Sequence, residues 1–232
     1  MKNLFRRFLS VSIACLLALT INAQGQTIKT KDLEIKLVTD FSWVYDDRGT
    51  GQDTDLSIYK PLPPSGFHIL GYYAQAAHKH PGVIGIAVKG ITPGAIAYPV
   101  DYKWIWSDAG SGGDYNCTVY EPIPPNGYLA LGNVISNNGS KPSLTEVVCI
   151  RRDLVVGAGG IGKMLWNDAG SGGEVNGSTW YIKPPHIQDD KMAYFTSGSF
   201  VCVTSHSKPR FSDVAYALEV KMNTTEKNLN PQ

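Results

Sequence analysis

Three short segments combine a carboxylate, a glycine-rich turn and a second acidic side chain. Each follows the pattern Asp-x-Gly-[Ser/Thr]-Gly-x-[Asp/Glu], and the paired acids are Asp47 and Asp53, Asp108 and Asp114, and Asp168 and Glu174. Two carboxylates around a flexible loop supply the oxygen ligands that Ca²⁺ prefers. They also accept hydrogen bonds from sugar hydroxyls, while a neighbouring Trp or Tyr ring stacks on the sugar face. The six acids are therefore candidate ligand-binding residues.

A structural role explains the same pattern. In that interpretation the first Asp caps its own turn, the glycines adopt positive φ angles, and the last acid begins the next strand in solvent. The segments carry fewer carboxylates than dedicated calcium loops, and no Cys/His cluster has zinc spacing. We therefore assign no metal-ligating residue and no cofactor, and keep calcium as the alternative.

Aromatic side chains stand two residues before each acidic segment. Trp106 and Trp166 precede the second and third segments, and Tyr45 precedes the first. Exposed at strand tips, such rings form a glycan or lipid surface, so Trp106 and Trp166 join the candidate ligand-binding residues. Packing in the core is the competing role. Alternation along the strand predicts that Trp104 and Trp106 share one face, with Ile105 on the other.

Residue types with catalytic potential lack the surroundings that catalysis requires. Ser111 and Ser171 lie in Gly-Ser-Gly, whereas a nucleophile elbow is Gly-x-Ser-x-Gly at a strand-to-helix turn. No helical period follows either serine. His78 and His80 flank one lysine and could bind a surface metal, but we favour a solvated loop for them. We predict that the protein is not an enzyme.

The acidic segments belong to an internal repeat with offsets of 61 and 60 residues. Tyr45–Gly51 aligns with Trp106–Gly112 and then with Trp166–Gly172. The match continues downstream, where Ser57–Pro64 lies over Thr118–Pro125 without a gap. A repeat of this length is one structural unit that must bury its apolar face against its neighbours.

The pattern within each unit predicts strands. Leu33–Val38 and Tyr102–Trp106 alternate with period two, and the Pro-Pro segments must cross between strands. Three like sheets packed around one axis bury all three apolar faces. We predict an all-β fold, a β-prism of three antiparallel sheets with a pseudo-threefold internal repeat, and keep a β-sandwich as the alternative. The repeats span about 33–91, 95–154 and 155–222 of a single domain, residues 24–222.

The N-terminus has the features of a secretory signal peptide. Three basic residues precede an uncharged apolar stretch from Phe8 to Ile21, and Ala23 follows at the expected cleavage position. We predict that residues 1–23 are removed and that the protein is secreted, to an extracellular or periplasmic location. A lipoprotein with lipid on Cys15 is the alternative. Residues 223–232 are polar and predict a flexible tail.

The mature chain has little charge imbalance. Residues 1–23 hold three basic and no acidic side chains, so their removal changes the formal charge from +1 to −2. This charge excludes electrostatic attraction to nucleic acid, and no transmembrane segment follows the signal. Cys117, Cys149 and Cys202 remain. They are either oxidised in part, with one left unpaired, or buried as small apolar side chains.

The order of the motifs resembles a known family. Trp-x-Asp-x-Gly-Ser-Gly, then Tyr-x-Pro-x-Pro-Pro-x-Gly-Tyr, then the block Lys141–Leu154 are similar to the Vps62-related family. The likeness covers roughly Leu33 to Val220. A weaker similarity extends to β-prism domains that contact membranes peripherally. The family has no agreed biochemical activity, so the resemblance implies no catalytic residue.

Export, repeats and aromatic-plus-Asp turns together favour a recognition module. We expect a secreted, non-catalytic protein that binds glycan or membrane lipid through loops at one end. A targeting component of a toxin or pore-forming system, or a structural protein, is the alternative.

Overall fold

Strands form nearly all the regular structure of the described residues. The computed structural model describes residues 27–185, 192–196, 200–210 and 216–221, and within them the one helix is the short 3-10 turn η1 (Arg152–Leu154). None of the described helical structure is long and apolar enough to cross a bilayer. The predicted signal peptide, Cys15 and the predicted tail lie outside the described residues.

Each repeat contains six strands in the same order. The first holds β2 (Leu33–Val38), β3 (Phe41–Asp46), β4 (Ser57–Pro61), β5 (His68–Ile69), β6 (Tyr73–Gln75) and β7 (Gly85–Gly90). The second holds β8 (Ile96–Ala97), β9 (Asp101–Ser107), β10 (Thr118–Ile123), β11 (Tyr128–Leu129), β12 (Val134–Ser136) and β13 (Cys149–Arg151). The third holds β14 (Val155–Gly157), β15 (Gly160–Asn167), β16 (Ser178–Lys183), β17 (Met192–Phe195), β18 (Phe200–Val203) and β19 (Tyr216–Lys221).

The strands of one repeat pair into two small sheets rather than one. One sheet has the order β2-β7-β5, and its counterparts are β8-β13-β11 and β14-β19-β17. The other has the order β3-β4-β6, repeated as β9-β10-β12 and β15-β16-β18. Strand β1 (Thr27–Lys29) extends the first sheet along β2. The all-β class and the threefold repeat are confirmed, and the arrangement is compatible with a prism. Three sheets were expected, but the structure has six small ones, two in each repeat.

A β-bulge occurs at the same place in all three repeats. In the β9/β10 ladder Val119 pairs with Trp106 while the next residue, Tyr120, pairs with Trp104. The extra residue, Ile105, changes the phase of the strand. Ile105 and Trp106 are therefore both buried, and Trp104 is 43% exposed. The prediction that Trp104 and Trp106 share a face is wrong for this reason.

The core lies where the three repeats meet. Trp106 and Trp166 contact each other edge to face, with ring centroids 5.3 Å apart. A Cβ added to Gly71 would lie 3.1 Å from the Cα of Gly132, so the two Leu-Gly segments require glycine for their close approach. Between them and the third repeat, the Asn133 side chain accepts a 2.7 Å hydrogen bond from the Cys202 amide.

The cysteines belong to this interior. Cys117, Cys149 and Cys202 are all free and buried in the structure. Burial raises the pKa of each thiol, to about 12 for Cys149 and Cys202. They serve as small apolar side chains, which was one of the two predicted states.

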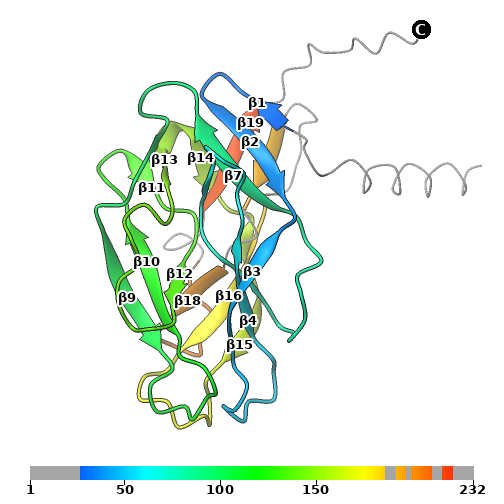
Figure 1. Ribbon diagram of the computed structural model, residues 1–232, viewed down its shortest axis with the longest axis vertical. Helices are drawn as coiled ribbons and strands as arrows, with labels where there is room; N and C mark the ends of the chain where they lie inside the picture. The colour runs from blue at the N-terminus through cyan, green and yellow to red at the C-terminus, as the bar shows by residue number, and fades with distance from the viewer. Residues whose placement is uncertain (1–26, 186–191, 197–199, 211–215, 222–232) are drawn as a thin grey trace, which may run out of the picture.

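Figure 1 shows how the repeats position the acidic segments. The connections that follow β3, β9 and β15 project together from the lower end of the molecule. We call this region, residues 47–56, 108–117 and 168–177, the loop end.

Candidate ligand-binding site at the loop end

The first Asp of each segment organises its own loop. Asp47 accepts a 2.8 Å hydrogen bond from the Leu56 amide, which closes the loop across nine residues. Asp168 does the same for the Gly177 amide at 2.8 Å. The glycines Gly49 and Gly110 have φ angles of +83° and +82°, a region that favours glycine. These contacts fit the structural role foreseen for the pattern.

The same carboxylates join one repeat to another. The indole Nε1–H of Trp166 donates to Asp47 Oδ2 at 2.6 Å, and that of Trp106 donates to Asp168 Oδ2 at 3.1 Å. Each bond is buried and links the strand aromatic of one repeat to the acidic loop of the next. Hydrogen bonds to an ionised acceptor in such surroundings are stronger than neutral ones.

Two histidines complete these clusters. His78 Nε2 lies 2.6 Å from Asp47 Oδ1, and His206 Nε2 lies 2.6 Å from Asp168 Oδ1. Because an ionised carboxylate only accepts, each ring donates its Nε2–H. Sequence reasoning gave neither histidine a partner. The shared spacing to proline, His78 to Pro81 and His206 to Pro209, was the signal that could have paired them.

The second repeat departs from this arrangement. The aromatic beside Asp108 is Tyr45, whose buried hydroxyl has no hydrogen-bond partner among the described residues. No histidine occurs between β12 and β13. Asp108 therefore lacks both side-chain donors, and burial raises its pKa. The pseudo-threefold symmetry of the loops is broken at this position.

The predicted ligand-binding residues divide into two groups. Trp106 and Trp166 are 1% exposed, so they pack in the core and present no face to a ligand; that part of the prediction is corrected. Asp47 and Asp168 are buried with their oxygens already bonded, and Asp108 is half-buried. The second acids, Asp53, Asp114 and Glu174, are exposed and stay candidates.

Main-chain hydrogen bonds fasten neighbouring loops together. The Asp114 amide donates to the Arg48 carbonyl at 2.8 Å, and the Glu174 amide donates to the Ala109 carbonyl at 3.1 Å. A Cβ on Gly49 would come within 2.7 Å of Asp114 Oδ1. At the loop end the second repeat therefore contacts both the first and the third.

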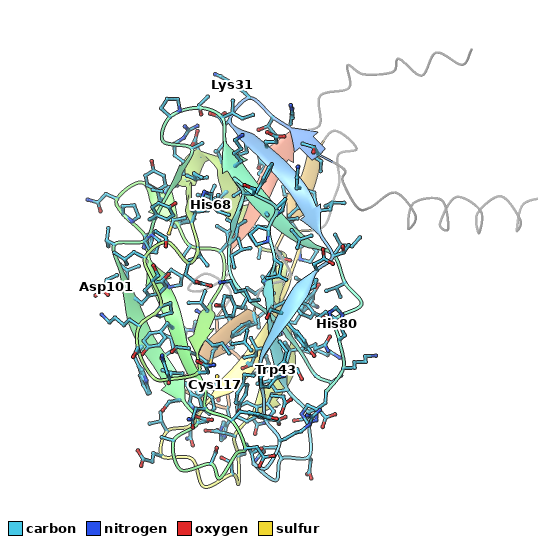
Figure 2. The ribbon with its side chains drawn as sticks, in the orientation of Figure 1. Lys31, Trp43, His68, His80, Asp101 and Cys117 are labelled. Atoms are coloured by element: carbon cyan, nitrogen blue, oxygen red, sulfur yellow. The ribbon has the colours of Figure 1, made fainter. Side chains whose placement is uncertain are left out.

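A groove opens where the first and second repeats meet at this end. The Trp43 and Tyr115 rings contact each other at 72°, with centroids 4.8 Å apart, and are 43% and 39% exposed. With Asp46, Arg48, His78 and the β4 residues Ser57 and Tyr59 they enclose about 270 Å³. Figure 2 places Trp43 in the lower half of the molecule, away from Lys31 and His68. The sequence analysis did not foresee this contact between Trp43 and Tyr115.

Metal-binding capacity is limited in the part of the chain that the structure describes. It contains no group of three or more His, Cys, Asp or Glu side chains placed to hold a metal ion. In the Asp47 and Asp168 clusters the donors are indole, imidazole and amide N–H groups, which compete with a cation for the carboxylate oxygens.

The fold and the loop end define an all-β module of three repeats. Its sequence matches the family described as vacuolar protein sorting-associated protein 62 over residues 13–229, and the chain belongs to this Vps62 family. The crystal structure of GNIP1Aa from Chromobacterium piscinae is similar in fold, with a TM-score of 0.67 at 22% identity. The likeness covers 81% of this chain and 37% of that one. Curated proteins gave no match.

Proposed function

We propose that this protein is a non-catalytic recognition module that binds glycans at its loop end. The observation that carries the proposal is the exposed Trp43–Tyr115 pair above a groove with a carboxylate and a guanidinium. Aromatic rings contact the apolar face of a sugar, and charged groups beside them hydrogen-bond its hydroxyls.

The described titratable groups support a binding role over catalysis. The buried carboxylates of Asp47 and Asp168 already accept internal hydrogen bonds, which leaves them little capacity as general bases. Burial raises the pKa of the cysteine thiols and keeps them as poor nucleophiles. Family membership and the β-rich neighbour are compatible with a non-enzymatic module.

A targeting role within a larger system is the second candidate. The fold likeness to GNIP1Aa occupies 37% of that longer chain, so the same architecture occurs as one part of a bigger protein. In that case recognition by the loop end would deliver a partner to its target surface.

Glycan arrays and liposome flotation test the proposal on the folded protein. We expect specific array signals and no retention on vesicles of phosphatidylcholine alone. Binding to vesicles without any array signal would replace glycan by lipid. No binding in either assay, with a cooperative melting transition, would overturn the recognition function.

A further inference from the structure

The groove between the first and second repeats has side chains that differ from those at the two equivalent positions of the repeat. Trp43 corresponds to Trp104 and Met164, and Asp46 corresponds to Ser107 and Asn167. We infer that this groove is the protein's one sugar-binding site and that it takes a single neutral hexose unit at a chain end. The inference rests on the proposed function and names its site, ligand class and stoichiometry.

The two equivalent positions in the other repeats lack the side chains that we assign to sugar binding. Arg48 is replaced by Ala109 and Ala169, so neither counterpart has a guanidinium. Tyr115, which covers Trp43, corresponds to Thr54 in the first repeat and Val175 in the third. The second repeat retains an exposed Trp104 but without the carboxylate, the guanidinium or the second aromatic ring. Among the described residues, one of the three equivalent positions therefore carries the two aromatic rings, the carboxylate and the guanidinium together.

Hydrogen bonds and an ion pair to Asp46 fix the side chains that line the groove. Asp46 is buried, accepts the Trp43 indole N–H at 3.2 Å and lies 3.4 Å from the Arg48 guanidinium. The Arg48 amide also donates to Asp46 Oδ1 at 3.3 Å. The Arg48 side chain is half exposed and lines the groove. Asp46 therefore orients the Trp43 ring and the Arg48 guanidinium, and the guanidinium is a preorganised donor for a sugar hydroxyl.

His78 connects the groove to the rigid framework. Its Nε2 is held by the buried Asp47, and its Nδ1 lies 3.6 Å from Asp55. Since Asp47 also accepts the Trp166 indole N–H, the groove wall is fixed by contacts to the third repeat. The Ser57 hydroxyl is buried at the floor and makes no well-formed hydrogen bond among the described residues.

The charges that line the groove and the volume of the groove indicate which class of ligand it binds. Asp46 offsets Arg48, and Asp47 and Asp55 stand beside His78, so the site has no excess positive charge for an acidic sugar. Its volume of about 270 Å³ lies below the roughly 300–1,000 Å³ of pockets for drug-sized ligands. The rings meet at 72° and form a corner rather than a flat platform, which suits the end of a chain.

Titration calorimetry with a panel of methyl glycosides of neutral hexoses tests the inference. We expect a stoichiometry of one, and at least tenfold weaker binding in Trp43→Ala, Tyr115→Ala and Arg48→Ala. Trp104→Ala is the matched control, because it removes an equally exposed indole from the second repeat. It should bind as the wild type does. Thermal melting must show that each variant is folded.

The outcomes separate this inference from the proposed function. If binding on the array survived Trp43→Ala, Tyr115→Ala and Arg48→Ala, the groove would not be the sugar-binding site, although the protein would still recognise glycans. Three sites per chain, or equal loss in Trp104→Ala, would also overturn it. Tighter binding of sialylated glycosides or of choline than of any neutral hexose would contradict the ligand class. No binding on arrays or vesicles would remove the proposed function itself.

Discussion

The Trp166 indole and the Asp47 carboxylate meet at 2.6 Å and join the third repeat to the first. The bond closes the ring of repeats, since residues 119 positions apart in sequence share it. Trp106 and Asp168 make the corresponding contact between the second and third repeats. The acidic turns thus connect neighbouring repeats, and the Trp43–Tyr115 groove lies beside one of them.

Removing the indole donor tests this fastening. Trp166→Phe leaves Asp47 Oδ2 buried without its partner and opens space in the core, so we expect a loss of about 2–4 kcal/mol in the free energy of unfolding. Urea denaturation measures it. Trp104→Phe, at an exposed position, should change stability by less than about 0.5 kcal/mol. Equal effects of the two changes would contradict a structural role for the Trp166–Asp47 bond.

Removing the Tyr45 hydroxyl, unlike removing the Trp166 indole, should not destabilise the protein. Its hydroxyl is buried without a hydrogen-bond partner among the described residues, and burial raises its pKa far above the usual range. Tyr45→Phe removes this desolvated group, whose burial costs about 1–3 kcal/mol. We expect unchanged or higher stability in urea denaturation. A loss above about 1 kcal/mol would show that Asp108 or Cys117 binds the hydroxyl in solution.

The cysteines should be unreactive in the folded state. Burial raises the pKa of Cys117, Cys149 and Cys202 and keeps them from solvent. In a chain beginning at Gln24, we expect no reaction with a thiol-specific chromophore in native buffer and three equivalents in denaturant. Fewer than three in denaturant without reductant would show that two of the cysteines form a disulfide.

The internal repeat and the turns could be predicted because each has a recognisable pattern in the sequence. Offsets near 60 residues gave the threefold architecture, and glycine spacing gave the turns around Gly49 and Gly110. The β-bulge at Ile105 could not be predicted, because one extra residue in a strand has no compositional signature. That bulge decides which indole is buried. The Trp43–Tyr115 groove depends on two repeats meeting, and no local pattern reports such a contact.

The raised pKa of Asp108, the loop aspartate of the second repeat, should make the stability of the protein depend on pH. Burial raises its pKa above the ordinary 3.8, so the folded protein binds this proton more tightly than the unfolded chain does. The stability from this group is fully present below pH 3.8 and is lost as pH rises through the raised value. Asp108→Asn carries no charge at any pH and keeps an acceptor for the Cys117 amide. The variant should therefore melt at or above the wild-type temperature at pH 7.

The difference in melting temperature should shrink as the pH is lowered toward 3.8, where wild-type Asp108 is protonated too. Asp47→Asn is the matched control. Its carboxylate accepts N–H groups from Leu56, His78 and Trp166, and a neutral amide replaces these charge-assisted bonds with weaker ones. That variant should melt below the wild type at pH 7. If the two substitutions lowered the melting temperature alike, the two aspartates would have equivalent surroundings in solution, contrary to the structure.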